Sequence, residues 1–410
     1  MKTLLIIGIG NVALKYLDQA LQRQGLRAVV LGRRAGLCRA MEPYLRGVCW
    51  YDVDADDDGA LEAEIRLHPR RYANVWAVTT LYDERFPAVL RLGQQFGWRT
   101  PPYCLAQLSA KRRVQAFIPE YSPPSLCFRA DEAATVDLAA AARWGEQVIV
   151  KPALASGGLG IAYLPSVALR PRLLEHLAAQ GGPGDAQWLL QRCLDGRLLS
   201  FEGYAFDGSL RRLGISSRSR LGLTEVGNRF PVCEGVPTAV REAGWACIQQ
   251  LLERAGLNFG YFHCEFIQGL DHLWLIDANA GRIGGATLLE QIAQAYQLNT
   301  ADLLAHVLLL PLLEAAAPCP FAAIQAEPQA TLGIWYGCPA SARLEHLDAA
   351  VVQCCHTQFA AEGHRVPAVG SSDHAWVGML SGEPRRVLQA IEQISLLTDR
   401  GRFKPAYCLD

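Results

Sequence analysis

Residues 261–285 read YFHCEFIQGLDHLWLIDANAGRIGG and carry the strongest structural signal in the chain. Two apolar segments flank a short turn at 269–272, so the stretch predicts a β-hairpin. Glu265 stands in the middle of the first strand and Asp277 at the end of the second. Residues that lie near each other across an antiparallel pair can point from the same face. We therefore expect these two carboxylates and the amide oxygen of Asn279 to converge.

Three oxygen ligands at one place suit magnesium, which leaves further coordination positions to water and nucleotide phosphates. A carboxylate inside an apolar strand is costly to bury unless it has a partner. Glu265 therefore requires one, and the alternative to a metal ion is a buried salt bridge, for which Arg282 is a candidate. We favour magnesium because Asp277, Asn279, Arg282 and a pair of glycines crowd the same turn.

A glycine-rich motif lies upstream of the hairpin, between two strand-like segments. Residues 148–152 form a short β-rich run that contains Lys151, residues 155–160 read ASGGLG, and residues 161–164 are again strand-like. Amide groups in such a loop can fold over a triphosphate, and the lysine can supply a positive charge. The loop is not a Walker A motif, because no lysine followed by serine or threonine closes it. A flexible hairpin without a ligand is the alternative.

The first 100 residues alternate between strand-like and helix-like segments, which predicts a parallel sheet covered on both faces. The first strand, 3–7, leads into GIGNVA at 8–13, the GxGxxA form of a dinucleotide fingerprint. The next strand ends in Arg33 and Arg34 without a carboxylate, which disfavours NAD and leaves NADP open. We prefer a tight turn with no cofactor. Asp83 follows a later strand, where open α/β sheets bind ligands, and is a candidate to meet a substrate.

Composition excludes several classes of protein. A formal net charge of -1 argues against sequence-independent binding of nucleic acid, which needs a basic excess. The thirteen cysteines include no CxxC pair, so we expect neither a disulfide scaffold nor a zinc site, and reduced thiols fit a cytoplasmic protein. The apolar run at the N-terminus is too short and too interrupted by glycine for a signal peptide. Residues 303–313 are too short to span a bilayer and are interpreted as a core helix, so we expect no membrane partner.

Taken in order along residues 100–300, these motifs resemble the ATP-grasp superfamily, and in particular its carboxylate–amine ligases such as the L-amino acid (dipeptide) ligases. The resemblance implies an α/β fold with three parts. Residues 1–100 would form a Rossmann-like N-terminal domain. Residues 101–315 would form an ATP-grasp domain of two α+β subdomains that clasp ATP, with its lid at about 112–195. Residues 316–410 would form a small C-terminal α+β subdomain.

The same resemblance implies two sets of ligand-binding residues. The expected ATP-binding residues are Lys111, Lys151, Ser156, Gly157, Gly158, Gly160, Gln191, Leu194 and Glu202. The expected magnesium ligands are Glu265, Asp277 (a glutamate in the family) and Asn279.

The resemblance also implies catalytic residues, and the chemistry of arginine suggests candidates that bind the substrate. Arg282 and Lys151 correspond to the groups that act on the transferring phosphoryl group. Arg218 and Arg220 have guanidinium groups that can pair with a substrate carboxylate, and a solvated loop is the alternative for both. Gly285 completes the substrate candidates.

Besides Asp277, three further positions depart from the family pattern. Gln191 replaces the glutamate that is usual at the adenine. Leu198 stands near the place of a second acidic residue, so Glu202 is the substitute for that contact. Arg282 falls one residue later than in the family, with Gly281 as the apparent insertion.

The resemblance implies a ligase that uses ATP with one or two Mg²⁺ ions, for which Mn²⁺ can substitute. A carboxylate, in the family an amino acid, would be activated as an acyl phosphate and coupled to an amine, with release of ADP and phosphate. Three alternatives stay open: an ATP-dependent carboxylase that acts through carboxyphosphate, an NADP-dependent oxidoreductase, and a non-catalytic nucleotide-binding protein. The expected partners are small-molecule carboxylate and amine substrates. The C-terminal residues either complete the substrate pocket or form a contact in a homodimer.

Overall fold

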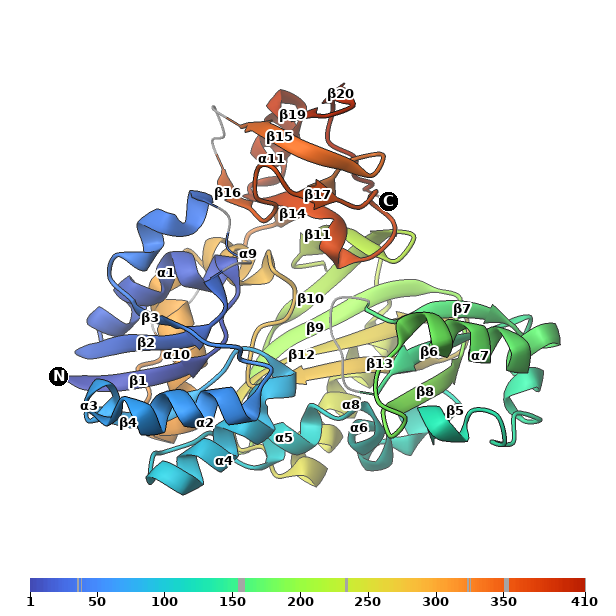
Figure 1. Ribbon diagram of the computed structural model, residues 1–410, viewed down its shortest axis with the longest axis horizontal. Helices are drawn as coiled ribbons and strands as arrows, with labels where there is room; N and C mark the ends of the chain where they lie inside the picture. Colours follow the sequence, from blue (N-terminus) through green and yellow to red (C-terminus); the bar gives the residue numbers. More distant parts are fainter. Residues whose placement is uncertain are drawn as a thin grey trace.

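The structure is a computed structural model that describes residues 1–34, 37, 39–153, 159–232, 235–322, 324, 326–349 and 354–409. Figure 1 shows an N-terminal α/β unit on the left, a large central sheet, a small sheet on the right, and a C-terminal region with its own small sheet at the top. The mixed α/β character that the sequence predicts is confirmed.

The N-terminal unit is built on a parallel sheet with the strand order β3-β2-β1-β4. Its strands are β1 (Lys2–Ile7), β2 (Leu26–Gly32), β3 (Cys49–Asp52) and β4 (Val75–Thr79). The helices around it are α1 (Asn11–Gln22), α2 (Asp58–Leu67) and α4 (Phe86–Phe96). Alternate side chains of β1 pack with α1 on one face and with α2 and α4 on the other. The predicted parallel sheet, covered on both faces, is confirmed, and it explains the continuous apolar run at the N-terminus.

The central sheet has eight strands in the order β13-β12-β9-β10-β11-β14-β18-β16. The first five in this order are β13 (Leu273–Ala280), β12 (Phe259–Gln268), β9 (Arg197–Phe206), β10 (Ser209–Leu221) and β11 (Thr224–Phe230). The other three are β14 (Thr331–Gly337), β18 (Trp376–Gly382) and β16 (Cys355–Gln358). Because β14 pairs with β11, the boundary that we expected at 316 is not a break in this sheet.

The predicted hairpin at 261–285 is confirmed, since β12 and β13 are antiparallel neighbours. One face of β9 and β12 is apolar: Phe201, Phe262 and Phe266 pack with α8 (Thr238–Ala255). Successive side chains of a strand point to opposite faces, so the intervening residues lie on the other side of the sheet. That second face carries the polar residues described below.

The small sheet is antiparallel and has the strand order β5-β8-β6-β7. Its strands are β5 (Ser125–Arg129), β6 (Gln147–Pro152), β7 (Ala162–Pro165) and β8 (Gln187–Arg192), and α7 (Leu169–Gln180) packs on it. The two strands predicted on either side of the glycine-rich loop are confirmed as β6 and β7. Residues 154–158 of that loop lie outside the described residues.

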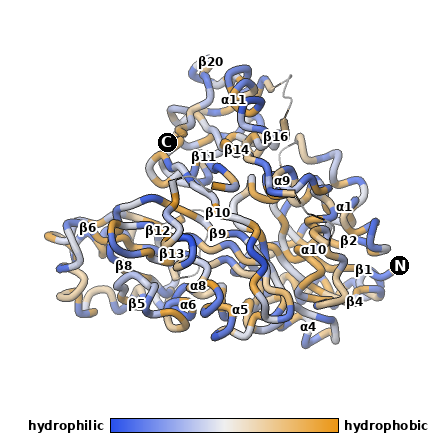
Figure 2. The backbone as a smooth tube through the Cα atoms, turned by 180° about the vertical axis from the view of Figure 1, so that it is seen from behind, coloured by the Kyte–Doolittle hydropathy of each residue, from blue (hydrophilic) through white to orange (hydrophobic). Residues whose placement is uncertain are grey.

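The predicted core helix at 303–313 is confirmed as α10 (Thr300–Leu313), which is buried along almost its whole length. It packs against α1 and β12, and its apolar colour in Figure 2 marks the core that joins the N-terminal unit to the central sheet. In the part of the chain that the structure describes, no single helix is long and apolar enough to cross a membrane. The bent pair Leu288–Ala295 and Thr300–Ala316, at 115°, meets the length and composition limits together.

The remaining helices are short and the remaining strands form a small C-terminal sheet, β17-β15-β19-β20. The helices are α3 (Pro69–Tyr72), α5 (Cys104–Leu108), α6 (Lys111–Phe117), α9 (Leu288–Ala295) and α11 (Pro384–Gln393). The strands of the C-terminal sheet are β15 (Ala342–Asp348), β17 (Arg365–Val366), β19 (Ser395–Thr398) and β20 (Gly401–Phe403). Every cysteine of the described ranges is free.

A buried polar cluster connects α1 to the later parts of the chain. Lys15 on α1 donates to Glu290 Oε1 at 2.7 Å, and the side chain of Glu290, on α9, is fully buried. The second oxygen of Glu290 accepts from Ser381 on β18 at 2.6 Å, and Lys15 also donates to Thr357 Oγ1 on β16 at 3.0 Å. The cluster therefore fixes the N-terminal unit against the C-terminal strands.

Lys15→Met is expected to lower the free energy of unfolding by about 3–5 kcal/mol, because it leaves a buried carboxylate without its cation. Urea titration measures this loss. The control is Arg23→Gln at the C-terminal cap of the same helix. The ion pair of Arg23 with Asp302 joins side chains that are 40% and 39% exposed. That control is expected to cost less than about 1 kcal/mol. Equal small losses in the two variants would contradict the assignment of Lys15.

Candidate functional site

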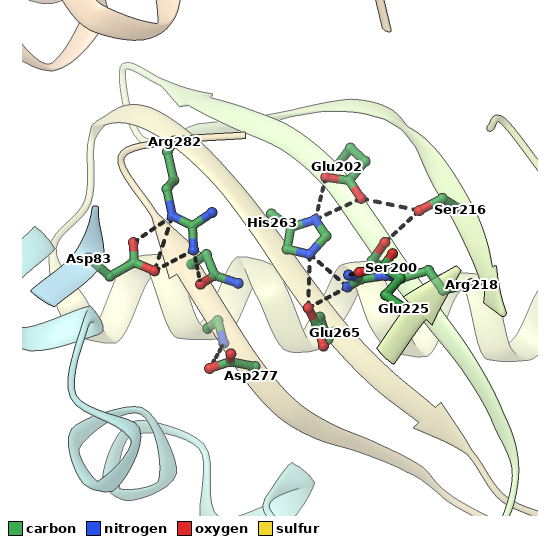
Figure 3. A network of polar contacts seen from close by, with 12 residues as sticks. Asp83, Ser200, Glu202, Ser216, Arg218, Glu225, His263, Glu265, Asp277 and Arg282 are labelled. Atoms are coloured by element: carbon green, nitrogen blue, oxygen red, sulfur yellow. Dashed lines mark hydrogen bonds and ion pairs between the residues drawn. The ribbon is translucent and has the colours of Figure 1, made fainter. Parts of the chain in front are cut away.

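One face of the central sheet carries a row of polar side chains, drawn in Figure 3. Residues that are paired across neighbouring strands point to the same face. The polar residues aligned in this way are Ser200 and Glu202 on β9, His263 and Glu265 on β12, and Asp277 and Asn279 on β13. The three expected magnesium ligands therefore lie on one face, and Glu265 is the direct cross-strand partner of Asp277.

Glu265 lies among cationic groups and is 9% exposed. Arg218 donates to its Oε1, His263 Nε2 lies 3.2 Å from the same oxygen, and Arg220 Nη2 lies 3.7 Å from Oε2. Burial alone would raise the pKa of Glu265, but Arg218 and His263 hold this pKa well below its ordinary value. The carboxylate is therefore ionised. The salt bridge that we weighed for Glu265 is present, but its partner is Arg218 and not Arg282.

Two lysines reach the end of β13 from different elements. Lys111, the first residue of α6, has its Nζ 3.4 Å from Asp277 Oδ1. Lys151 on β6 donates to the backbone oxygen of Ile276 at 3.3 Å. Burial, and next the charge of Lys111, lower the pKa of Lys151 to about 8. The structure thus brings both expected phosphate-binding lysines to the carboxylate pair, and it leaves Lys151 short of compensating negative charge.

Arg282 is bound to the N-terminal unit. Its Nη2 donates to Asp83 Oδ2 at 2.7 Å and to Asn279 Oδ1 at 2.6 Å. Burial works against the charged form, but the carboxylate of Asp83 raises the pKa of Arg282. Asp83, which we expected to meet a substrate, forms an ion pair with Arg282 instead, and Arg282 also holds the amide of an expected metal ligand.

Arg218 and Arg220 lie on β10, so the alternative of a solvated loop is wrong for both. Arg218 is buried, and its guanidinium group is held between Glu225 and Glu265. Its two carboxylate partners conflict with the expectation that it binds a substrate carboxylate. The side chain of Arg220 is 38% exposed. Gly285, the third substrate candidate, has φ +65° and lies beside Arg218.

Glu225 is a residue of this site that the sequence analysis did not single out. It accepts hydrogen bonds from Arg218 and is 3% exposed. Arg220 is its cross-strand partner in β10 and β11. A glutamate placed across a short glycine-containing turn from alternating arginines is the signal that could have identified it.

Glu202 does not have the surroundings that a ribose ligand needs. Both of its carboxylate oxygens lie 2.9 Å from His263 Nδ1, Ser216 donates to Oε1 at 3.3 Å, and the residue is 1% exposed. Burial would lower the pKa of His263, but Glu202 raises it to about 9. The pair is therefore a buried ion pair, and the expectation that Glu202 binds the ribose is corrected.

The other expected ATP-binding residues lie on or beside the small sheet. Gln191 on β8 is 2% exposed, and its Nε2 has no hydrogen-bond partner within the described ranges. A buried amide without a partner is unfavourable, so the position fits an acceptor atom of a ligand. Leu194 is half-buried just beyond β8, and Gly160 has φ +67° at the end of the glycine-rich loop. The expectations for Ser156, Gly157 and Gly158 fall outside the described residues.

The donor set on β12 and β13 fits magnesium. No group of three or more histidine, cysteine, aspartate or glutamate side chains forms a metal centre in the described part of the chain. Glu265, Asp277 and Asn279 provide two carboxylates and one amide oxygen on adjacent strands. Magnesium is commonly bound by one or two carboxylates while water and nucleotide phosphates supply its other ligands.

The side chain of Tyr82 occupies the space in front of the first glycine motif. Gly8 has φ +70°, and a Cβ built there would lie 2.7 Å from the ring of Tyr82. The hydroxyl of Tyr82 lies 3.7 Å from the corresponding position at Gly10. The ring occupies the space in front of the turn that a pyrophosphate would need, which argues against a dinucleotide there and favours the cofactor-free turn.

Gly284→Ala is expected to lower the free energy of unfolding by about 1–3 kcal/mol, because a new methyl group would overpack the buried His263 ring. A Cβ at Gly284 would lie 2.2 Å from His263 Cδ2. The matched change Gly184→Ala meets its nearest atom at 3.5 Å and should leave stability unchanged. Urea unfolding curves compare the two, and equal stability of both variants would show that His263 can move aside.

No protein-family model and no curated protein sequence matches this chain. Solved structures do match it over almost its full length. The L-amino acid ligase from Bacillus licheniformis is similar with a TM-score of 0.75 and 15% identity, over 97% of this chain and 98% of that one. Phosphoribosylglycinamide synthetase from Anaerococcus prevotii is similar with a TM-score of 0.65 and 14% identity, over 96% and 99%.

A carboxylase is similar to about the same degree. The biotin carboxylase domain of the 2-oxoglutarate carboxylase from Hydrogenobacter thermophilus, solved as a dimer with MgADP, ADP and bicarbonate, has a TM-score of 0.71 and 15% identity. The match covers 97% of this chain and 91% of that one. Ligases and carboxylases of the ATP-grasp type thus share the architecture of this chain, and likeness at such low identity establishes the fold alone.

Proposed function

Because the chain has the ATP-grasp fold, we propose that it is a magnesium-dependent, ADP-forming ligase that joins a carboxylate to an amine through an acyl phosphate. The observation that carries the proposal is the pairing of Glu265 with Asp277 beside two lysines. A carboxylate pair for a cation and an adjacent lysine pair for phosphates are the two halves of a site for a metal-bound nucleotide.

In this proposal ATP lies between the small sheet and the central sheet. The unpartnered Nε2 of Gln191 donates to the adenine, with Leu194 against the base. Lys111, Lys151 and the glycine-rich loop that ends at Gly160 neutralise the phosphates. The buried ion pair of Glu202 leaves the ribose without an assigned partner.

Glu265, Asp277 and Asn279 would hold one or two magnesium ions, and manganese accepts the same oxygen ligands. Bound there, magnesium would neutralise the charge that develops on the β- and γ-phosphates. The protein's own cations complete the site. Lys151 and Arg282 stabilise the transferring phosphoryl group, and the partly exposed Arg220 pairs with the substrate carboxylate.

The reaction has two group transfers. A substrate carboxylate oxygen attacks the γ-phosphorus in line, and the bond from that phosphorus to the bridging oxygen of ADP breaks. The amine then attacks the acyl carbon, loses a proton and expels phosphate. Water must be kept from the intermediate between the two steps, which is the role we propose for the glycine-rich loop.

The carboxylase alternative is favoured by a specific finding, the similarity to a biotin carboxylase domain at a TM-score of 0.71. In that alternative bicarbonate is the carboxylate that is phosphorylated. The oxidoreductase alternative has no such support, because Tyr82 fills the glycine turn. A cytoplasmic location and a homodimer remain proposals as well.

The test of the proposed function is a two-substrate panel. Purified protein with MgATP receives amino acids or bicarbonate as the carboxylate and amines as the nucleophile, and products are identified by mass spectrometry. An amide formed with consumption of ATP supports the ligase. A bicarbonate-dependent carboxylated product would favour the carboxylase, and no turnover with any pair would favour a non-catalytic nucleotide-binding protein.

The depressed pKa of Lys151 predicts that binding of MgATP weakens as pH rises above about 8. Bound phosphates favour the charged form of Lys151. At a pH where Lys151 has lost its proton in the free protein, binding of MgATP therefore takes up a proton. Stability has the opposite dependence. The ordinary pKa of a lysine is about 10.4. Between pH 8 and that value, Lys151 takes up a proton when the protein unfolds, so its contribution to the free energy of unfolding rises with pH. Calorimetry in buffers of different ionisation enthalpy measures the proton uptake, and binding without proton uptake at pH 9 would contradict the prediction.

A further inference from the structure

We propose that Asp83, from the N-terminal unit, is the positioning residue for Arg282, and that the first glycine motif serves to seat the turn that carries it. The inference rests on the proposed function, in which Arg282 meets the transferring phosphoryl group and the turn that carries Asp83 orients this arginine. It gives the glycine motif a role without a dinucleotide.

The contact between the two residues is extensive. Arg282 Nε lies 3.1 Å from both carboxylate oxygens of Asp83, and Nη2 donates to Oδ2 at 2.7 Å. Their side chains are 18% and 12% exposed. Nη2 also donates to Asn279 at 2.6 Å. Two acceptors on different elements fix the plane of the guanidinium group of Arg282. Within the described ranges these hydrogen bonds use Nε and Nη2, which leaves Nη1 for a phosphoryl oxygen.

The turn that presents Asp83 is built on the glycine motif. Thr80 Oγ1 donates to the backbone oxygen of Ile7 at the end of β1 at 2.7 Å, and it accepts from the backbone NH of Tyr82 at 3.0 Å. The ring of Tyr82 then lies over Gly8 and Gly10. A side chain at Gly8 would strike this ring at 2.7 Å, so the glycine is required for the ring to lie there.

The loop that presents Arg282 is shaped by the same turn. Gly281 has φ +84°, and a Cβ there would lie 2.6 Å from Phe86 Cζ, three residues after Asp83. Its backbone NH donates to Tyr261 at 2.7 Å. Gly281 is the residue by which the loop exceeds the expected spacing. The absence of a side chain at Gly281 therefore leaves room for Phe86, next to the residue Arg282 that pairs with Asp83.

Asp83→Asn keeps the size of the side chain and removes its charge. If Asp83 orients Arg282, kcat falls by about 10²-fold while KM for ATP changes little, because small misplacements of a catalytic group cost that much. The control is Arg23→Gln, which breaks another ion pair between the N-terminal unit and the later chain, at 2.8 Å between Arg23 and Asp302. The control should retain wild-type kcat.

A double-mutant cycle separates positioning from a structural role. When two residues act as one unit, their losses do not add. Asp83→Asn combined with Arg282→Gln should therefore be no slower than Arg282→Gln alone. Additive losses, or a wild-type kcat in Asp83→Asn, would overturn the inference.

Hydrogen–deuterium exchange tests the same contact without turnover. The backbone amides of residues 281–287 should exchange faster in Asp83→Asn than in wild type, and at the wild-type rate in Arg23→Gln. Unchanged exchange in Asp83→Asn overturns the inference even in a protein that turns over nothing. Faster exchange in a protein without turnover would instead contradict only the proposed function. Tyr82→Leu, which keeps both charges and removes the seated ring, should show the same change if Asp83→Asn does not fold.

Discussion

Glu265→Gln is expected to reduce the rate of ADP release by about 10²–10³-fold, the cost of removing one preorganised electrostatic group from a buried site. The substitution keeps the shape of the side chain and removes the charge that the proposed magnesium ion needs. Arg218 still has Glu225 as a partner, so the folded structure should persist. ADP release in the presence of MgATP and a carboxylate measures the effect, and a circular dichroism melt checks the fold.

The matched control for this change is Glu242→Gln. Glu242 forms an exposed ion pair with Arg212 at 3.0 Å, between side chains that are 58% and 49% exposed. The control should retain wild-type turnover. A Glu265→Gln protein that turns over at the control's rate would remove Glu265 from the metal site.

The second large effect is expected for Lys151→Met. Loss of a charge-assisted contact to phosphate costs about 1.5–3 kcal/mol, which corresponds to a dissociation constant for MgATP that is about 10–100-fold higher. The free energy of unfolding should not fall in parallel. Burial lowers the pKa of Lys151, which means that the charged side chain is already disfavoured in the folded protein.

Calorimetric titration with MgATP and urea unfolding of the same sample give the two numbers for Lys151→Met. Lys404→Met is the control, since Lys404 is an exposed lysine near the C-terminus. Weaker binding together with an equal loss of stability would indicate a structural lysine. Unchanged binding would exclude Lys151 from the phosphate site.

The parts of the site that the sequence predicted are those fixed by local rules. The two apolar segments that flank a short turn in 261–285 specified a hairpin, and its antiparallel pairing indicated which side chains share a face. The pairing of Glu265 with Asp277 follows from that register. The lysine-bearing strand β6 and its antiparallel partner β7 were predicted in the same way, from two short strands on either side of a glycine-rich loop.

The parts that could not be predicted depend on contacts between distant segments. Arg218 and Glu265 are 47 residues apart, and Asp83 and Arg282 are 199 apart. No periodicity in the sequence connects such positions. The sequence required a partner for Glu265 and suggested Arg282, but it could not identify Arg218 as the actual partner. The sequence also did not indicate that Glu202 would form a buried ion pair with His263. The two residues lie on β9 and β12, and which strands become neighbours depends on the tertiary fold.

The C-terminal part shows the same limit. The family resemblance implied a separate subdomain from residue 316, and β14 nevertheless extends the central sheet beside β11. Trp335 and Tyr336 belong to the C-terminal residues that we expected to complete a substrate pocket or form a dimer contact, and both are fully buried in β14. Edge strands accept new neighbours through backbone hydrogen bonds, and composition does not encode that choice.

We propose that this chain cleaves ATP at the γ-phosphate to activate a carboxylate. The direct measurement is identification of the nucleotide products by ion-exchange chromatography after incubation with MgATP and the carboxylate panel. We expect ADP and phosphate, formed only when a carboxylate is present, and formed about 10²–10³-fold more slowly by Glu265→Gln. AMP and pyrophosphate would contradict it.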